Sequence, residues 1–127
     1  MDPRLVARLI AGGRVGLGAL MLVAPGPIAE RWLGSGLASR PGVLALMRAL
    51  GARDLVIGLI AAHTVSHPEV GPRWQATCAA VDTADAVATA AARRDLPVAG
   101  VAGTIALAGG TAVVETFLAR ALRRVAA

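Results

Sequence analysis

Hydrophobic residues gather in four long segments of this 127-residue chain, and the pieces between them are short and rich in proline, glycine and charge. The fourth segment is the clearest, because residues 96–114 are nineteen consecutive positions without a charge. About 20 apolar residues are enough for a helix to cross a bilayer. The other three segments have a similar length, although each contains charged residues. The pattern predicts four long helices, at about residues 4–24, 43–63, 73–93 and 96–120.

The first connection is long enough to contain an element of its own. Its sequence IAERWLG mixes apolar and charged residues as a short helix in a membrane interface does, and Trp32 would lie at the depth of the lipid headgroups. We therefore expect an all-α fold: a four-helix transmembrane bundle in one integral membrane domain, residues 1–127, with a short interfacial helix near 27–33. The alternative is a soluble all-helical domain, but the fourth segment has no polar face wide enough to meet water.

Composition strengthens the membrane interpretation. Hydrophobic residues make up 56% of the chain and the mean hydropathy is +0.65, whereas a usual soluble domain is about 45–50% apolar. Alanine and glycine are abundant and aromatic residues are scarce, which favours close contact between helices.

The charge of the chain and its distribution limit the kinds of binding partner that we expect. The net charge is +5, but the arginines are dispersed and no aromatic platform accompanies them, so we expect no nucleic acid. The arginine counts of the connections favour a multi-pass protein of the cell (inner or plasma) membrane with both termini in the cytoplasm. Membrane lipids are the expected partners, together with a second copy of the chain or a partner membrane subunit.

Seven charged residues of the predicted membrane segments are candidates for bilayer depth, three arginines and four acids. A charge at bilayer depth costs at least about 2.5–3.5 kcal/mol, so such residues normally face the bundle interior and pair with one another. The near-neutral sum of the seven is what a paired interior requires. We expect a buried polar cluster formed by Arg14, Arg48, Arg53, Asp54, Asp82 and Asp85, with Gln75 and Glu115 as secondary members.

Helical periodicity indicates which face of each segment is polar. The third segment has one stripe along its whole length: Gln75, Cys78, Asp82, Asp85, Thr89 and Arg93. The second segment has a polar face made of Arg48, Gly51, Asp54 and Gly58, and the fourth has one made of Thr104, Ala108, Thr111 and Glu115. Arg53 points about 100° away from the face of its segment and must meet a different neighbour. Glu115 lies near the end of the fourth segment, where it would reach the interface beside Arg120.

Two interpretations of these charges stay open. In the first, the arginines of the first and second helices clamp the aspartates of the third in a structural network. In the second, Asp82 and Asp85 form a site: two carboxylates on one helix face repel, so one holds a proton and acts as an acid or proton carrier while its partner stays ionised. The sequence does not define a catalytic residue.

No cofactor or metal motif is recognisable. His63 and His67 are four residues apart, the spacing of a helical metal pair, but a proline follows His67 directly and we interpret both as part of a surface loop. The chain has no dinucleotide fingerprint, phosphate-binding loop, nucleophile elbow or zinc-protease motif. We expect neither a cofactor nor a metal site.

The stretch RALGARDLVIGL, residues 48–59, resembles a signature of small four-helix bacterial membrane proteins that are broadly similar to the DoxX-like group. The opening GRVGLGALMLVAP and the following RWLG resemble the first helix and loop of that family, and VDTADA resembles its acidic motif in the third helix. The fourth helix matches by hydropathy alone. The resemblance implies a four-helix membrane fold and no established activity. It also implies that the family's characteristic polar positions are Arg48, Arg53, Asp54, Asp82 and Asp85.

Three functions fit these patterns. The first, which we expect, is a non-enzymatic membrane component whose charges are structural. The second is a proton-coupled carrier of a small molecule, in which Asp82 or Asp85 exchanges protons. The third is an acid–base enzyme that acts on a lipid or isoprenoid, with an aspartate as proton donor and an arginine stabilising negative charge. A cavity beside the aspartates that opens to one or both membrane faces would favour the second function, one that opens sideways to lipid would favour the third, and a solid cluster would count against both.

Overall fold

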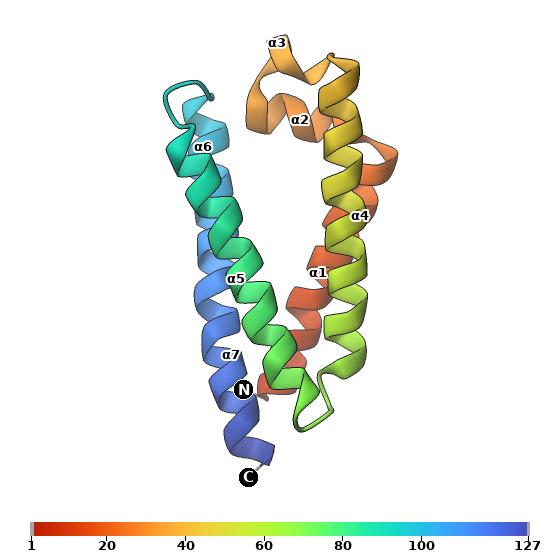
Figure 1. Ribbon diagram of the computed structural model, residues 1–127, viewed down its shortest axis with the longest axis vertical. Helices are drawn as coiled ribbons and strands as arrows, with labels where there is room; N and C mark the ends of the chain where they lie inside the picture. The colour runs from red at the N-terminus through yellow and green to blue at the C-terminus, as the bar shows by residue number, and fades with distance from the viewer. Residues whose placement is uncertain (1, 127) are drawn as a thin grey trace.

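The computed structural model describes the backbone of residues 2–126, and that part of the chain is helical with no strand (Figure 1). The elements in order are α1 (Pro3–Val23), α2 (Pro25–Leu33), α3 (Ser35–Ala38), α4 (Pro41–Thr64), α5 (Val70–Ala91), α6 (Val98–Thr104), the π-helical segment η1 (Ile105–Gly109) and α7 (Gly110–Ala126). Because α6, η1 and α7 follow one another without a break, they form one long helical segment. The prediction of an all-α fold is confirmed, with a helix in each of the five predicted places.

Proline and glycine set the helix ends. Pro3, Pro25 and Pro41 each occupy the first turn of a helix, where a missing N–H is not needed. The Asp2 side chain caps α1 by accepting a backbone hydrogen bond. Gly34 separates α2 from α3 and is the one described residue with a positive φ, 89°, a conformation that costs glycine little. These signals explain why the ends of α1, α2 and α4 lie close to the predicted ones.

The long helices are arranged as two pairs, α1 with α4 and α5 with the α6–η1–α7 segment (Figure 1). Glycines bring α1 and α4 into backbone contact. A Cβ atom added at Gly18 would lie 2.6 Å from the carbonyl oxygen of Gly51, and one added at Gly58 would lie 3.0 Å from the carbonyl oxygen of Ala11. Larger residues at these positions would separate the two helices. The glycines of the second segment were expected to let another helix approach closely, and that helix is α1.

The short helices α2 and α3 lie at one end of the molecule, and both termini lie at the other (Figure 1). Ala29 of α2 is fully buried in an apolar cluster with Met21 of α1 and Met47 of α4. Gly100 of α6 packs so closely on the carbonyl group of Trp32 that no side chain would fit between them. Contacts with α1, α4 and α6 thus hold α2 across this end of the bundle.

Two helical segments are long and apolar enough to cross a membrane, Pro3–Val23 with a mean hydropathy of 1.6 and Val98–Arg124 with 1.5. Only 28% and 17% of their most apolar stretches are buried. Large apolar side chains are also exposed on the other long helices, for example Leu46 (66%) on α4 and Val87 (62%) on α5. The crossing of a membrane by all four long segments remains a prediction.

Candidate functional site

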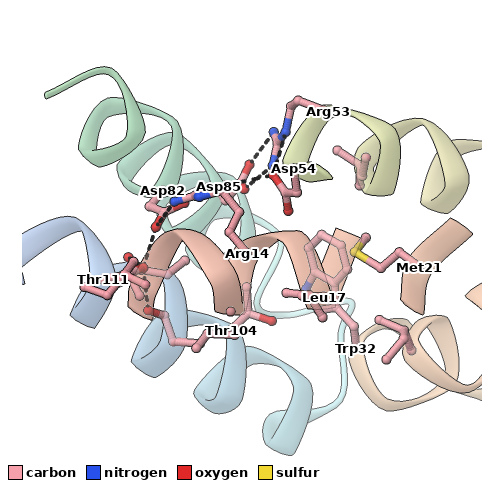
Figure 2. Close-up of a pocket in the computed structure, with 16 residues that line it drawn as sticks. Arg14, Leu17, Met21, Trp32, Arg53, Asp54, Asp82, Asp85, Thr104 and Thr111 are labelled. Carbon is pink, nitrogen blue, oxygen red and sulfur yellow. Dashed lines mark hydrogen bonds and ion pairs between the residues drawn. The ribbon is translucent and has the colours of Figure 1, made fainter. Parts of the chain in front are cut away.

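Arg14 of α1 is the centre of a buried ion-pair cluster (Figure 2). Its Nη2 lies 2.7 Å from Oδ2 of Asp82 on α5 and donates a hydrogen bond of 3.0 Å to Oε1 of Glu115 on α7. Its Nη1 lies 3.6 Å from Oδ1 of Asp54 on α4. The Arg14 side chain is only 8% exposed. One guanidinium therefore connects α1 to the three other long helices.

Arg53 of α4 extends the cluster toward the surface. It donates two hydrogen bonds to the Asp85 carboxylate of α5, 3.1 Å from Nη1 and 2.6 Å from Nη2. Its Nε and Nη2 also donate to Oδ1 of the adjacent Asp54, at 3.2 and 3.1 Å. The side chains of Arg53 and Asp85 are 33% and 29% exposed, so this outer pair reaches water or lipid while the Arg14 pairs do not.

Thr111 of α7 is a further member, which the sequence placed on the polar face of its helix without a role. Its hydroxyl donates a short hydrogen bond to Oδ2 of Asp82, and the same hydroxyl oxygen lies 2.9 Å from the carbonyl oxygen of Leu107. Leu107 belongs to η1, which directly precedes α7. Wide turns of this kind occur frequently at functional sites, because they shift a helix face locally.

Arg48 is not part of the cluster, which corrects the sequence prediction. It is exposed, and its Nε donates to the carbonyl oxygen of Leu22 at 3.3 Å. The buried face of α4 passes through Met47, Gly51 and Asp54. Arg48 follows Met47 by one residue, so it is rotated about 100° away from that face. The periodicity placed Gly51 and Asp54 correctly and selected the wrong residue one turn before them.

The two secondary residues behave differently from each other. Glu115 was expected to reach the interface beside Arg120, but it is 1% exposed and belongs to the cluster through Arg14. Gln75 is also buried, at 2%, yet no cluster residue bonds to it, and its Oε1 has no hydrogen-bond partner within the described residues. Gln75 therefore lies on the polar stripe of α5 and outside the site.

The cluster carries more negative than positive groups. It contains two arginines and four acids: Arg14, Arg53, Asp54, Asp82, Asp85 and Glu115. The sequence predicted three arginines against four acids, but Arg48 lies elsewhere. If every group were ionised, the cluster would carry a net charge of −2, although each acid contacts an arginine. Because an uncompensated buried charge costs several kcal/mol, the cluster favours a proton or a bound cation.

Two carboxylate oxygens at the centre of the cluster are free. Every hydrogen bond of Asp54 and the closest contact of each of its ion pairs use Oδ1, and those of Asp82 use Oδ2. Within the described residues, Oδ2 of Asp54 and Oδ1 of Asp82 thus accept no hydrogen bond, although the two residues are only 8% and 5% exposed. Figure 2 shows one Asp54 oxygen turned away from Arg53, toward the side where Leu17 and Trp32 lie.

A cavity of about 430 Å³ lies against the cluster (Figure 2). This volume is within the range of small-molecule sites, about 300–1,000 Å³. One end of the cavity is polar and includes both Asp54 and Asp82. Its walls are mostly apolar and include Ile10, Leu17, Met21, Ile28, Trp32 and Leu50. The arrangement is a lipophilic pocket with a charged end.

The exposed lining residues of the cavity lie on α1 and η1. Gly13 of α1 and Leu107 of η1 both line it, and both are exposed, Leu107 to 58%. The helices packed on η1 are α5, α6 and α7, and α1 makes no extended contact with it in the described part of the chain. At the end of the bundle, Ile28 and Trp32 of α2 cover the cavity. A ligand would therefore enter across the helix axes.

The two histidines lie away from this site, and Cys78 lies one turn before Asp82 on the buried face of α5 without lining the cavity. His63 is in the last turn of α4 and not in a loop, whereas His67 lies in the turn, where its Nδ1 accepts the backbone N–H of Val70 at 3.2 Å. Cys78 is buried as a free thiol. The described residues contain no group of three or more histidine, cysteine or acidic side chains that could hold a metal ion.

Comparison with known proteins assigns no family. No protein-family model matches the chain, no curated protein matches its sequence and no solved structure matches its fold. The resemblance to the DoxX-like group therefore stays a prediction. The site must be interpreted from its own geometry.

Proposed function

We propose that this chain is a multi-pass membrane protein that binds a lipid-like small molecule, without a chemical step, in the cavity between α1 and η1. The observation that carries the proposal is the cavity itself, which joins apolar walls to a charged end and has its exposed lining residues, Gly13 and Leu107, on α1 and η1. A purely structural cluster needs no such cavity. The proposal thus departs from the first function, in which the charges are only structural, and shares with the third a lipid-like ligand, without its acid–base step.

The distribution of side chains supports membrane insertion. Charges are buried at the centre, while large apolar side chains such as Leu9 and Phe117 are 66% and 62% exposed. The 24 residues of α4 and the 22 of α5 give lengths of about 36 and 33 Å at 1.5 Å per residue. The hydrocarbon core is about 30 Å thick. In a bilayer, the cavity mouth between α1 and η1 would face lipid.

A second candidate, the proton-coupled carrier, is favoured by the two acids in excess of arginines. A carboxylate that gives up its proton when a cationic molecule binds would couple proton movement to ligand movement. A carrier requires the same binding cavity, and in addition a second conformation in which the cavity opens on another side. Binding is therefore the first property to test.

Gly13 offers a test that does not disturb the cluster. It lines the cavity mouth, and a Cβ added there meets nothing within 4 Å, so Gly13→Phe can fill the mouth without a backbone clash. Gly12 is equally exposed and equally free of neighbours but does not line the cavity, which makes Gly12→Phe the matched control.

The experiment purifies the membrane fraction, washes it with alkaline carbonate, and extracts the chain into mild detergent for mass spectrometry of small molecules that co-purify. We expect the chain to stay in the washed membranes, and a lipophilic molecule to be retained by the wild type and the Gly12→Phe variant but lost from Gly13→Phe. Release of the chain by the wash would refute the membrane assignment. Equal retention in both variants, or no retained molecule in the wild type, would refute the binding site.

A further inference from the structure

The charged end of the cavity offers acceptors and few donors. Nε, Nη1 and Nη2 of Arg53 all donate to carboxylates, and both terminal nitrogens of Arg14 lie within 3.6 Å of a carboxylate oxygen. By contrast, Oδ2 of Asp54 and Oδ1 of Asp82 accept no hydrogen bond in the described part of the chain. A ligand that enters here meets unused carboxylate oxygens.

Charge balance favours the same kind of ligand. The cluster has two acids more than it has arginines, so a ligand with a positive charge lowers the cost of burying them. An anionic head group would add to the excess and would find the guanidinium donors already engaged. A neutral hydroxyl head group would satisfy one acceptor but leave the charge unbalanced.

We propose that the ligand of this cavity is an amphiphile with a positively charged nitrogen, and that Asp54 and Asp82 bind this nitrogen while the apolar walls hold its hydrocarbon part. The inference rests on the proposed binding function and names its ligand class. Both aspartates are more than nine-tenths buried and both line the cavity. An alkylammonium ion has up to three N–H donors, which is enough to reach both free oxygens.

Trp32 provides the readout, because it lines the cavity and the chain has only one other tryptophan, Trp74. The Trp74→Phe variant in zwitterionic nanodiscs leaves Trp32 as the single fluorophore. The probes are an ω-bromoalkyl amine, the alcohol and the carboxylic acid of the same chain length, since bromine quenches tryptophan on contact. The Trp32→Phe variant measures quenching by probe that is merely dissolved in the bilayer.

We expect the amine to reach half-maximal quenching of Trp32 at a concentration about tenfold lower than the alcohol, and the acid to be weakest, because a charge-assisted hydrogen bond is about twice as strong as a neutral one. In the Asp54→Asn variant, the amine and the alcohol should reach half-maximal quenching at similar concentrations. The matched control is Glu69→Gln, which removes the same charge from an exposed turn and should leave the tenfold preference intact. If Asp54→Asn fails to fold, the order of the three probes in the protein with Asp54 intact still tests the preference for a cationic ligand.

The outcomes separate the two proposals. Equal quenching of Trp32 by amine and alcohol, or tightest binding of the acid, would overturn the cationic ligand and leave the binding function standing. Quenching of Trp32 by none of the probes beyond the level seen with Trp74 would overturn both. Loss of the amine preference in Glu69→Gln as well as in Asp54→Asn would assign it to general surface charge and overturn the role of Asp54.

Discussion

Arg14 is the residue whose replacement most directly tests the energetics of the cluster. In Arg14→Gln, Glu115 loses its hydrogen bond of 3.0 Å and Asp82 loses its ion pair at 2.7 Å. Asp82 keeps the hydroxyl of Thr111, but Oε1 of Glu115 keeps no partner in the described part of the chain. Removal of one partner from a buried ion pair typically costs about 3–5 kcal/mol, because the other charge stays buried and unpaired. We expect Arg14→Gln to lower the free energy of unfolding by about that amount.

Replacement of the acidic partner, Glu115, should lower the free energy of unfolding much less than replacement of Arg14. Glu115→Gln keeps an acceptor for Arg14 and removes one of the two acids in excess, although its amide nitrogen would occupy the buried Oε2 position, which has no partner among the described residues. We expect a change of about 1 kcal/mol or less. In the double variant, Glu115→Gln should recover about 1–3 kcal/mol of the loss caused by Arg14→Gln, since the two side chains are in direct contact.

Reversible unfolding in mixed micelles of mild detergent and dodecyl sulfate, followed by far-ultraviolet circular dichroism, measures these differences. The control is Arg8→Gln on the same helix, because Arg8 is exposed and bonds only Ser66 among the described residues. Surface substitutions usually change stability by about 0.5 kcal/mol or less. If Arg14→Gln is no more harmful than Arg8→Gln, the cluster contributes nothing measurable. If Glu115→Gln costs as much as Arg14→Gln, the argument from excess negative charge is wrong.

Two further predictions use the same unfolding assay. Asp85→Asn should cost about 1 kcal/mol or less, because the pair with Arg53 is about a third exposed and a partly solvated ion pair contributes little; a loss as large as that of Arg14→Gln would contradict this. Gly18→Ala should cost about 1–3 kcal/mol, because its Cβ would lie 2.6 Å from the carbonyl oxygen of Gly51, whereas Gly12→Ala, with free space around it, should be neutral or stabilising by up to about 1 kcal/mol. Equal effects of the two glycine substitutions would show that close packing of α1 on α4 is not needed.

The long helices were predictable because their signals are local. Apolar runs bounded by Pro25, Pro41 and Pro97 mark helix ends by chemistry that does not depend on neighbours. The inward face of α5 was predictable for a similar reason, since Asp82 and Asp85 repeat at the helical period. Arg48 shows the limit of periodicity: a face defined by polar residues can differ by one position from the face that is buried.

Other features depend on how helices meet, which one sequence does not encode locally. The role of Glu115 required knowing that Arg14, 101 positions earlier, lies opposite it. The cavity required knowing that α1 packs on α4 and not on η1. The π-helical turn at Ile105–Gly109 has a run of small and apolar residues that is equally compatible with an α-helix. Only the two adjacent glycines, Gly109 and Gly110, mark the place in the sequence.

The position of the cavity follows from what holds the two helix pairs together. Apolar clusters join the two pairs around Leu118 near the termini and around Cys78, one turn before Asp82, whereas the apolar cluster around Met47 holds α2 on α1 and α4. At the level of Arg14 the link between the pairs is made by ion pairs instead. Ion pairs fix distances between a few atoms but do not fill volume as interdigitated apolar side chains do. A space can therefore persist beside them.

This arrangement also bears on why the charges are there. Replacement of a whole buried ion-pair cluster by well-packed apolar residues is often neutral or stabilising, so stability alone does not account for such a cluster. In this chain, apolar residues of sufficient size at the position of Arg14 would project into the 430 Å³ cavity, which Arg14 lines. The cluster keeps the pairs together and keeps the cavity open with free oxygens of Asp54 and Asp82 at its end. A binding role explains both properties, and a purely structural role explains only the first.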